Sequence, residues 1–364
     1  MQHHIPPSPP GKIRNSAVEL LRAVSMFMIV ISHACVHSGF DLTLPGFGLN
    51  RFFVQFGVLG NLGVDIFVLI SGYFLCSKAV NFRSLLKLLL QVWFYSLTLF
   101  LGCRVVFGHY YTAHDYHKVF FPILFQEYWF CTAYVILFLL TPFLNLAIGA
   151  MDRKMHRRLI ALMLCLWSIL PAMTGQYMYN DITSQFVMLY MIGAYFRKYP
   201  TTDAFRPAAG WRRVILAVCL LVLLTLVFDY FEKRIALFEN SVSSLYARTS
   251  PVIIGCAVSM FSLAVSCKPF YSKFINNLGA CAFGIYLIHD NPIVRSILWK
   301  RIWRHADYFR SPILPVRILL SAILVYAACA LAEYLRIKYI ENRLLKMSEQ
   351  FIGKLRNLRR SERV

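Results

Sequence analysis

The sequence predicts an all-α integral membrane protein with about ten transmembrane helices and with both termini on the cytoplasmic side. The first observation is composition: 58% of the residues are hydrophobic, 15% are charged, and the mean hydropathy is +0.57. The second is the recurrence of apolar runs of about 18 residues or more, the length that an α-helix needs to cross a bilayer. The third is the clustering of Lys and Arg between these runs, which is typical of cytoplasmic loops.

Ten apolar runs follow one another along the chain, and each predicts one helix. They cover residues 17–37, 52–76, 85–107, 120–149, 158–175, 183–197, 213–231, 249–267, 277–299 and 312–335. The fourth run is too long for one simple span, so we expect residues 119–126 to form an interfacial or re-entrant piece. The sixth run is short, which indicates a tilted or partly unwound helix.

The orientation follows from the basic residues. With a cytoplasmic N-terminus, the inner segments hold Lys78, Arg83 and Lys87; Arg153, Lys154, Arg157 and Arg158; Arg197, Lys198, Arg206, Arg212 and Arg213; and Lys268 and Lys273. The early outer loops hold far fewer, which favours this orientation. The loop containing Lys300, Arg301, Arg304 and Arg310 would lie outside, where it could meet an anionic glycan or a lipid phosphate.

The predicted organisation is one membrane domain with short tails. Residues 1–15 form a Pro-rich disordered cytoplasmic tail, residues 16–335 the transmembrane domain, and residues 336–364 a basic cytoplasmic tail with an amphipathic helix. The formal net charge of +21 is explained by inner loops that face anionic lipid. Because the sequence shows no soluble basic domain, we do not expect it to bind nucleic acid. The first apolar run lacks a convincing cleavage site, so we interpret it as an uncleaved helix.

The first run carries the most informative polar pair, Arg22 and His33. Eleven residues separate them, which corresponds to ~16 Å along a helix. A charged residue within a bilayer is costly unless it faces a bundle interior or a wet cavity, and an imidazole is the usual general base for a hydroxyl. The alternative is an Arg that reaches the headgroups and a His that joins two helices. His37 could form a two-His metal site with His33, but no acid or third His lies at helical spacing, so we expect no metal.

Three further motifs contain candidate site residues. Asp65 is an acid within an apolar helix, and its alternative role is a salt bridge, for example to Arg22. Glu127, Trp129 and Tyr134 form either an aromatic belt or a sugar-stacking platform. His289, next to Asp290, is either a polarised base or a helix end before Pro292. The outer-loop residues His109, His114, Asp115 and His117 match no standard zinc spacing.

Taken in order, these segments resemble the membrane-bound acyltransferase-3 family. They are Arg22 and His33 in the first helix, GVDIFVLISGY, YWFCTAYVILFLLTPFLN and FGIYLIH, and the similarity extends from about Ser16 to Tyr334. Stand-alone bacterial O-acetyltransferases of surface polysaccharide are the most similar type. Many members have an Arg-x-x-Arg pair in the first cytoplasmic loop, whereas this chain has Arg83 and Lys87, which keep the charge but not the pair.

The resemblance implies a ten-helix fold in a bacterial inner (cytoplasmic) membrane and transfer of an acyl group, usually acetyl. Cytoplasmic acyl-CoA is then the co-substrate, no cofactor is permanently bound, and the acceptor is a hydroxyl of a cell-surface or lipid-linked glycan. By the family pattern His33 is the essential His and Arg22 the essential Arg of the first helix, and Asp65 lies in the motif of the second helix. We expect His33 and Asp65 to be catalytic and Arg22, Arg83 and Lys87 to bind the donor. We expect acceptor binding by Glu127, Trp129, Tyr134 and His289, with Asp65 orienting His33. The alternative functions are a glycolipid or small-molecule transporter or flippase, and a non-catalytic scaffold.

Overall fold

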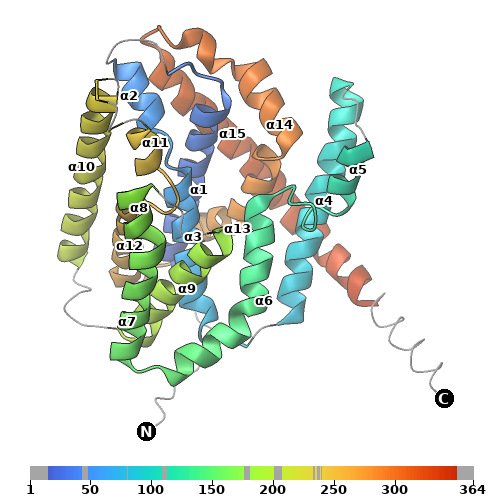
Figure 1. Cartoon of the computed structure of the whole chain (residues 1–364). Coiled ribbons are helices and arrows are strands. Elements are labelled where there is room, and N and C mark those ends of the chain that lie inside the picture. Colours follow the sequence, from blue (N-terminus) through green and yellow to red (C-terminus); the bar gives the residue numbers. More distant parts are fainter. Residues whose placement is uncertain are drawn as a thin grey trace, which may run out of the picture.

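The predicted all-α class is confirmed. The computed structural model describes residues 15–350 apart from 43–47, 80, 109–112, 176–180, 201–206, 233, 236–237 and 239. Within these residues the chain consists of helices and connecting segments, with no β-strand (Figure 1). Nearly all of the predicted N-terminal tail, the loop residue His109 and residues 351–364 of the predicted C-terminal tail lie outside the described residues.

The helices follow the predicted runs closely. Their bounds are α1 Ser16–His37, α2 Leu49–Phe56, α3 Gly60–Leu75, α4 Phe82–Phe107, α5 Ala113–Phe120, α6 Trp129–Ala150, α7 Arg153–Leu164, η1 Cys165–Ile169, α8 Leu170–Thr174, α9 Ile182–Lys198, α10 Pro207–Glu232, α11 Ser241–Leu245, α12 Pro251–Ser266, α13 Lys273–His289, α14 Pro292–Ser296, η3 Ile297–Trp303, η4 His305–Tyr308, α15 Leu314–Arg336 and η5 Ile337–Glu341. Among the described residues, seven helices are long and apolar enough to cross a membrane, and α12 is a shorter apolar helix.

Three of the predicted runs are divided in the structure. The second, at 52–76, is divided between α2 and α3 by residues 57–59. The fourth becomes α6, and the turns of residues 121–128 precede it. The run at 277–299 is not one helix, because α13 ends at His289 and α14 begins at Pro292. The side chain of Asn291 accepts from the amides of Ile293 and Val294 and so caps the new helix. This break places His289 and Asp290 at the end of α13, next to the end of α1.

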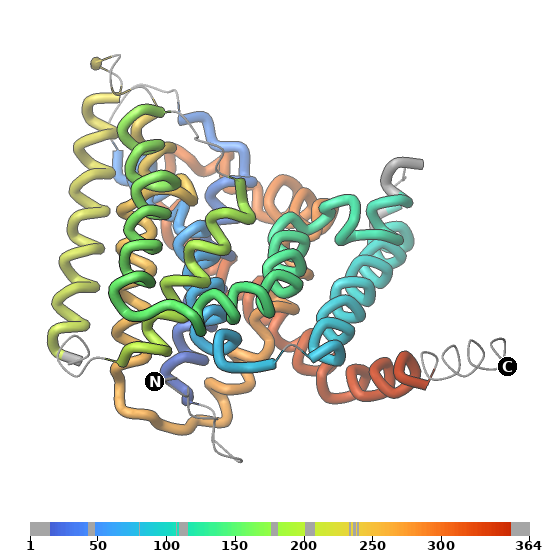
Figure 2. The backbone as a smooth tube through the Cα atoms, turned by 60° about the horizontal axis from the view of Figure 1, so that its bottom comes forward, coloured from blue at the N-terminus to red at the C-terminus, as the bar shows by residue number. Residues whose placement is uncertain are grey.

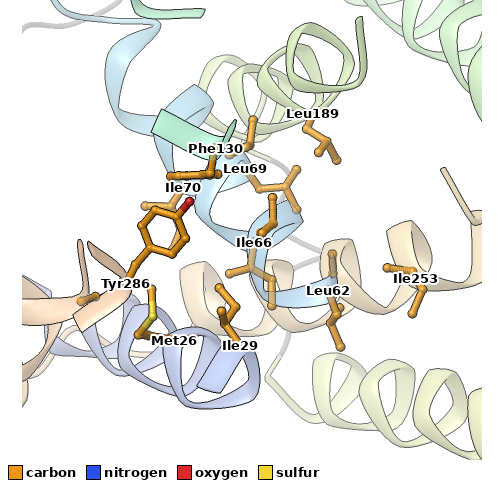
Figure 3. Close-up of a cluster of buried hydrophobic side chains, with 14 of the residues drawn as sticks. Met26, Ile29, Leu62, Ile66, Leu69, Ile70, Phe130, Leu189, Ile253 and Tyr286 are labelled. Atoms are coloured by element: carbon orange, nitrogen blue, oxygen red, sulfur yellow. The ribbon is translucent and has the colours of Figure 1, made fainter. Parts of the chain in front are cut away.

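The centre of the bundle contains α1, α3, α9 and α13. Figure 3 shows apolar side chains of α1, α3, α9 and α12 meeting there with Phe130 of α6 and Tyr286 of α13. Helices α3 and α9 approach closely because each has a glycine at the crossing. A methyl group on Gly72 would overlap the carbonyl of Tyr190, and one on Gly193 would overlap the carbonyl of Leu69.

Different helices form the two edges of the bundle. Helix α10 lies at one edge and α4 with α5 at the opposite edge (Figures 1 and 2).

The helix that starts as α15 continues to Gln350, so the predicted boundary at residues 335 and 336 lies within a continuous helix. The extension is linked to α4 by two ion pairs, Lys87 with Glu341 at 2.7 Å and Arg83 with Glu349 at 3.0 Å.

Candidate active site

One cavity of about 680 Å³ connects the two polar residues of α1. It is enclosed by side chains of α1, α3, α4, α6, α13 and α15, and both Arg22 and His33 contribute to its wall. Eleven residues along one helix correspond to ~16 Å, so the cavity extends through about half the thickness of the hydrocarbon core. We call its two ends the Arg22 end and the His33 end.

At the His33 end, two imidazoles form a hydrogen-bonded chain that ends on a backbone carbonyl. His289 Nδ1 lies 2.6 Å from the carbonyl oxygen of Ile285, and His289 Nε2 lies 3.0 Å from His33 Nδ1. A carbonyl can only accept, so a neutral His289 carries its proton on Nδ1 and accepts at Nε2. His33 therefore donates from Nδ1, and its own Nε2 keeps the lone pair. The carbonyl of Ile285 thus sets the tautomer of both rings.

An acid lies beside this chain. Asp290 Oδ1 is 3.4 Å from His33 Nδ1 and accepts a hydrogen bond from Arg295 Nη1 at 3.0 Å. His289 and Asp290 are both buried, whereas the side chain of His33 is 17% exposed. A proton taken up by His33 would therefore place its positive charge next to a carboxylate, which stabilises an imidazolium. His37, one turn beyond His33 on α1, also contributes to the cavity wall.

The Arg22 end contains cations that are paired with acids. Arg22 Nη1 is 2.8 Å from Glu19, which precedes it by three residues on α1. Arg336 forms a two-pronged pair with Glu333, with N–O distances of 2.7 and 2.8 Å, and also binds Glu341 at 2.8 Å. Glu333 in turn accepts from Gln91 Nε2 at 2.9 Å and from the Tyr95 hydroxyl at 2.6 Å.

These cations differ in access. Arg336 is buried, but the side chain of Arg22 is 24% exposed and that of Lys87 is 50% exposed. Arg22 and Lys87 both contribute to the cavity wall. An anionic ligand at this end would meet Arg22 and Lys87 with their charges accessible, while the Arg336–Glu333 pair shapes the wall behind them.

Aromatic side chains form the wall between the two ends. Trp129, Phe130 and Tyr134 of α6 and Tyr286 of α13 contribute to it. The Tyr134 hydroxyl lies 3.2 Å from Ser71 Oγ, and the guanidinium of Arg248 lies 5.3 Å from the Trp129 ring centroid. Aromatic faces beside polar groups suit the faces of sugar rings.

Asp65 differs from the expectation. It is fully buried and accepts a hydrogen bond from Gln185 Nε2 at 2.8 Å, and it does not contribute to the cavity wall. Neither the expected contact with His33 nor the alternative salt bridge to Arg22 is present: the acid beside His33 is Asp290, and the acid beside Arg22 is Glu19. Asp65 therefore connects α3 to α9 through Gln185.

The remaining candidates differ in whether they contribute to the cavity wall. Lys87, Trp129 and Tyr134 contribute to its wall, whereas Arg83 and Glu127 do not. The side chain of Arg83 is 63% exposed. His289 lies behind His33 rather than on the wall. No acid or third His lies at helical spacing from His33 and His37, but Asp290 and His289 meet His33 from another helix.

Sequence reasoning missed several residues around the cavity. Glu333 and Arg336 are an acid and a base three residues apart at the end of the last apolar run, and Gln91 is an amide within the third. Their polarity within apolar runs is the signal that could have identified them. Asp290 adjoins His289 in the sequence, but its contact with α1 depends on the fold.

Comparison with known families agrees with this arrangement. The family model described as an acyltransferase domain, of the acyltransferase-3 type, matches residues 15–334. Searches of the curated proteins and of the solved structures gave no match. The matched residues include Arg22, His33 and the helices that enclose the cavity, except for the last two residues of α15, one of which is Arg336, and the extension beyond them. The chain belongs to the membrane acyltransferase-3 family, and its all-α, multi-pass architecture is the membrane domain of an acyltransferase.

Proposed function

We propose that this acyltransferase moves an acyl group, which we expect to be acetyl, from acyl-CoA to a hydroxyl of a cell-surface or lipid-linked glycan. We place it in the inner (cytoplasmic) membrane of a bacterium, with the Arg22 end toward the cytoplasm. The observation that carries the proposal is a single cavity with accessible cations at one end and a tautomerically fixed imidazole at the other.

The donor fits the Arg22 end by charge. Acyl-CoA carries phosphates, and guanidinium and ammonium groups bind phosphate as a fork and as a point charge, respectively. Arg22 and Lys87 are accessible on the wall there. The pantetheine arm of CoA is long and slender, so a thioester held by its nucleotide near Arg22 would extend along the cavity toward His33.

The acceptor fits the His33 end by chemistry. His33 Nε2 removes the proton of a sugar hydroxyl as the oxygen attacks the thioester carbonyl carbon. The new C–O bond forms, the C–S bond breaks, and the imidazolium returns the proton to the departing sulfur. The products are an ester and free CoA. Asp290, 3.4 Å from His33 Nδ1, stabilises the positive charge between these two steps. Trp129 and Tyr134 provide the aromatic face for the sugar.

The test uses membranes that contain the protein, incubated with acetyl-CoA labelled in the acetyl group. We expect label in the glycan fraction in a form that mild alkali releases, as it does an ester. His33→Ala should abolish this label at an unchanged amount of membrane-inserted protein. His117→Ala is the matched control, because His117 is an exposed residue of α5. Equal labelling by His33→Ala would overturn the assignment of His33, and movement of unlabelled glycan across the bilayer without labelling would indicate a transporter.

A further inference from the structure

Four potential metal ligands meet at the His33 end. His33 Nδ1 lies 3.0 Å from His289 Nε2 and 3.4 Å from Asp290 Oδ1. In a tetrahedral zinc site with bonds of 2.0–2.2 Å, neighbouring ligand atoms lie about 3.3–3.6 Å apart. The two distances from His33 Nδ1 are therefore close to those between ligands of one zinc ion.

His37 provides the fourth ligand. It follows His33 by four residues on α1, so the two side chains lie on one face of the helix, and their ring centroids are 5.2 Å apart. One ligand atom from each of His33, His37 and Asp290 lies within 4.8 Å of the others. A rotation of His37 about its side-chain torsions would bring its nitrogen toward the other three.

The groups that surround this cluster are those that orient metal ligands. A His that binds a metal through one nitrogen usually donates its other N–H to a carbonyl or carboxylate, which fixes the ring. His289 does so through Nδ1, which lies 2.6 Å from the carbonyl of Ile285, so its lone pair is on Nε2, the atom that accepts from His33 and that a metal would bind. The carboxylate of Asp290 is likewise held by Arg295 at 3.0 Å. Arg295 offsets the charge of Asp290, but zinc sites with three imidazole ligands do not require an anion.

We propose that His33, His37, His289 and Asp290 form a binding site for a transition-metal ion such as Zn²⁺, and that bound metal inhibits the enzyme. The inhibition follows from the tautomer. Metal at His33 Nδ1 displaces the proton from that nitrogen, and a neutral ring then carries its proton on Nε2. The lone pair that accepts the proton of the acceptor hydroxyl is lost. This second part rests on the proposed function, whereas metal binding does not.

The binding test uses the purified full-length protein, first treated with a chelator. Equilibrium dialysis with radioactive zinc should show about one ion per chain, and Co²⁺ should give the visible absorption of a tetrahedral site. His37→Ala should weaken binding at least tenfold, because it removes one of four ligands. His117→Ala should bind as the unmodified protein does, which also tests the outer-loop histidines. Absence of saturable binding at micromolar zinc, or equal binding by His37→Ala, would overturn the proposal.

The activity test follows transfer from labelled acetyl-CoA as zinc is added. We expect zinc to inhibit, a chelator to restore the rate, and His37→Ala to need at least tenfold more zinc for half inhibition, measured relative to its own rate without zinc. Activation by zinc, or equal inhibition of His37→Ala, would overturn the inhibitory role. If no transfer is observed at all, the proposed function fails, but the dialysis experiment still decides whether the metal site exists.

Discussion

Helix α1 contributes Arg22 to one end of the cavity and His33 to the other, and the two ends differ in their chemistry. At the His33 end, two neutral rings share hydrogen bonds that lead to a carbonyl, and Asp290 is within reach of His33. At the Arg22 end, Arg22 and Lys87 face Glu19 and Glu341, and no imidazole contributes to the cavity wall among the described residues there. One end is suited to moving a proton, and the other to exchanging one anion for another.

This difference shows how a single membrane helix can serve two substrates. Neutral imidazoles can be buried at small cost when their hydrogen bonds are satisfied, so a base can lie deep in the bundle. Cations need partners when no substrate is present, and the carboxylates of Glu19 and Glu341 provide them. An incoming phosphate would take over from these carboxylates. Variants at the two ends should therefore affect different kinetic parameters.

The largest effect is expected for His33→Gln, which keeps a polar side chain but removes the base. General-base catalysis contributes about 10²–10⁴-fold, so kcat should fall by that factor. The KM for acyl-CoA should remain nearly unchanged, because in the proposed mechanism the donor's phosphates bind at the other end. Initial rates at varied acyl-CoA measure both parameters. A rise in donor KM without a fall in kcat would contradict this division, because it would assign His33 to donor binding.

Arg22→Gln should produce the opposite pattern. A hydrogen bond to a charged group contributes about 1.5–3 kcal/mol, so the KM for acyl-CoA should rise about 10–150-fold. The rate at saturating donor should change much less. The same initial-rate series measures it, with Arg22→Lys as the variant that restores part of the charge. An unchanged donor KM in Arg22→Gln would remove this residue from donor binding.

A comparison of Asp290 and Asp65 should show which of the two acids takes part in the reaction and which one only connects helices. Asp290→Asn removes the charge beside His33, and we expect kcat to fall about tenfold, the size of about one pKa unit of charge stabilisation. Asp65→Asn keeps an oxygen for Gln185, and kcat per folded molecule should stay within about twofold. Rates are normalised to monodisperse purified protein, with a chelator present. A larger loss for Asp65→Asn than for Asp290→Asn would restore the original expectation for Asp65.

The smallest effects are expected on α4. Arg83 is 63% exposed, pairs with Glu349 and does not contribute to the cavity wall, so Arg83→Ala should change donor KM less than about twofold. Lys87 contributes to the cavity wall, and Lys87→Ala should raise donor KM about fivefold. Both are measured at several salt concentrations, since screening weakens such contacts. If Arg83→Ala raised donor KM more than Lys87→Ala did, the donor would have to bind nearer to Arg83, outside the cavity.

Periodicity and polarity predicted most of the fold, because long apolar runs admit few structures other than membrane helices. They also identified Arg22 and His33, whose polarity is costly within such a run. They could not identify which side chains contact each other across helices. Asp65 and Asp290 are both acids near apolar segments, and only the packing of α3 against α9 and of α13 against α1 decides which one meets His33. The helix break after His289, in contrast, has local signals, because Asn291 caps α14 and Pro292 begins it.

The most direct test of the central claim measures donor binding without transfer. Equilibrium binding of labelled CoA to purified protein is compared for the unmodified chain, His33→Gln and Arg22→Gln. We predict that His33→Gln binds CoA with unchanged affinity although it transfers nothing, and that Arg22→Gln loses at least tenfold in affinity. Loss of CoA binding in His33→Gln, together with normal binding in Arg22→Gln, would contradict the division of the cavity into a proton-transfer end and an anion-binding end.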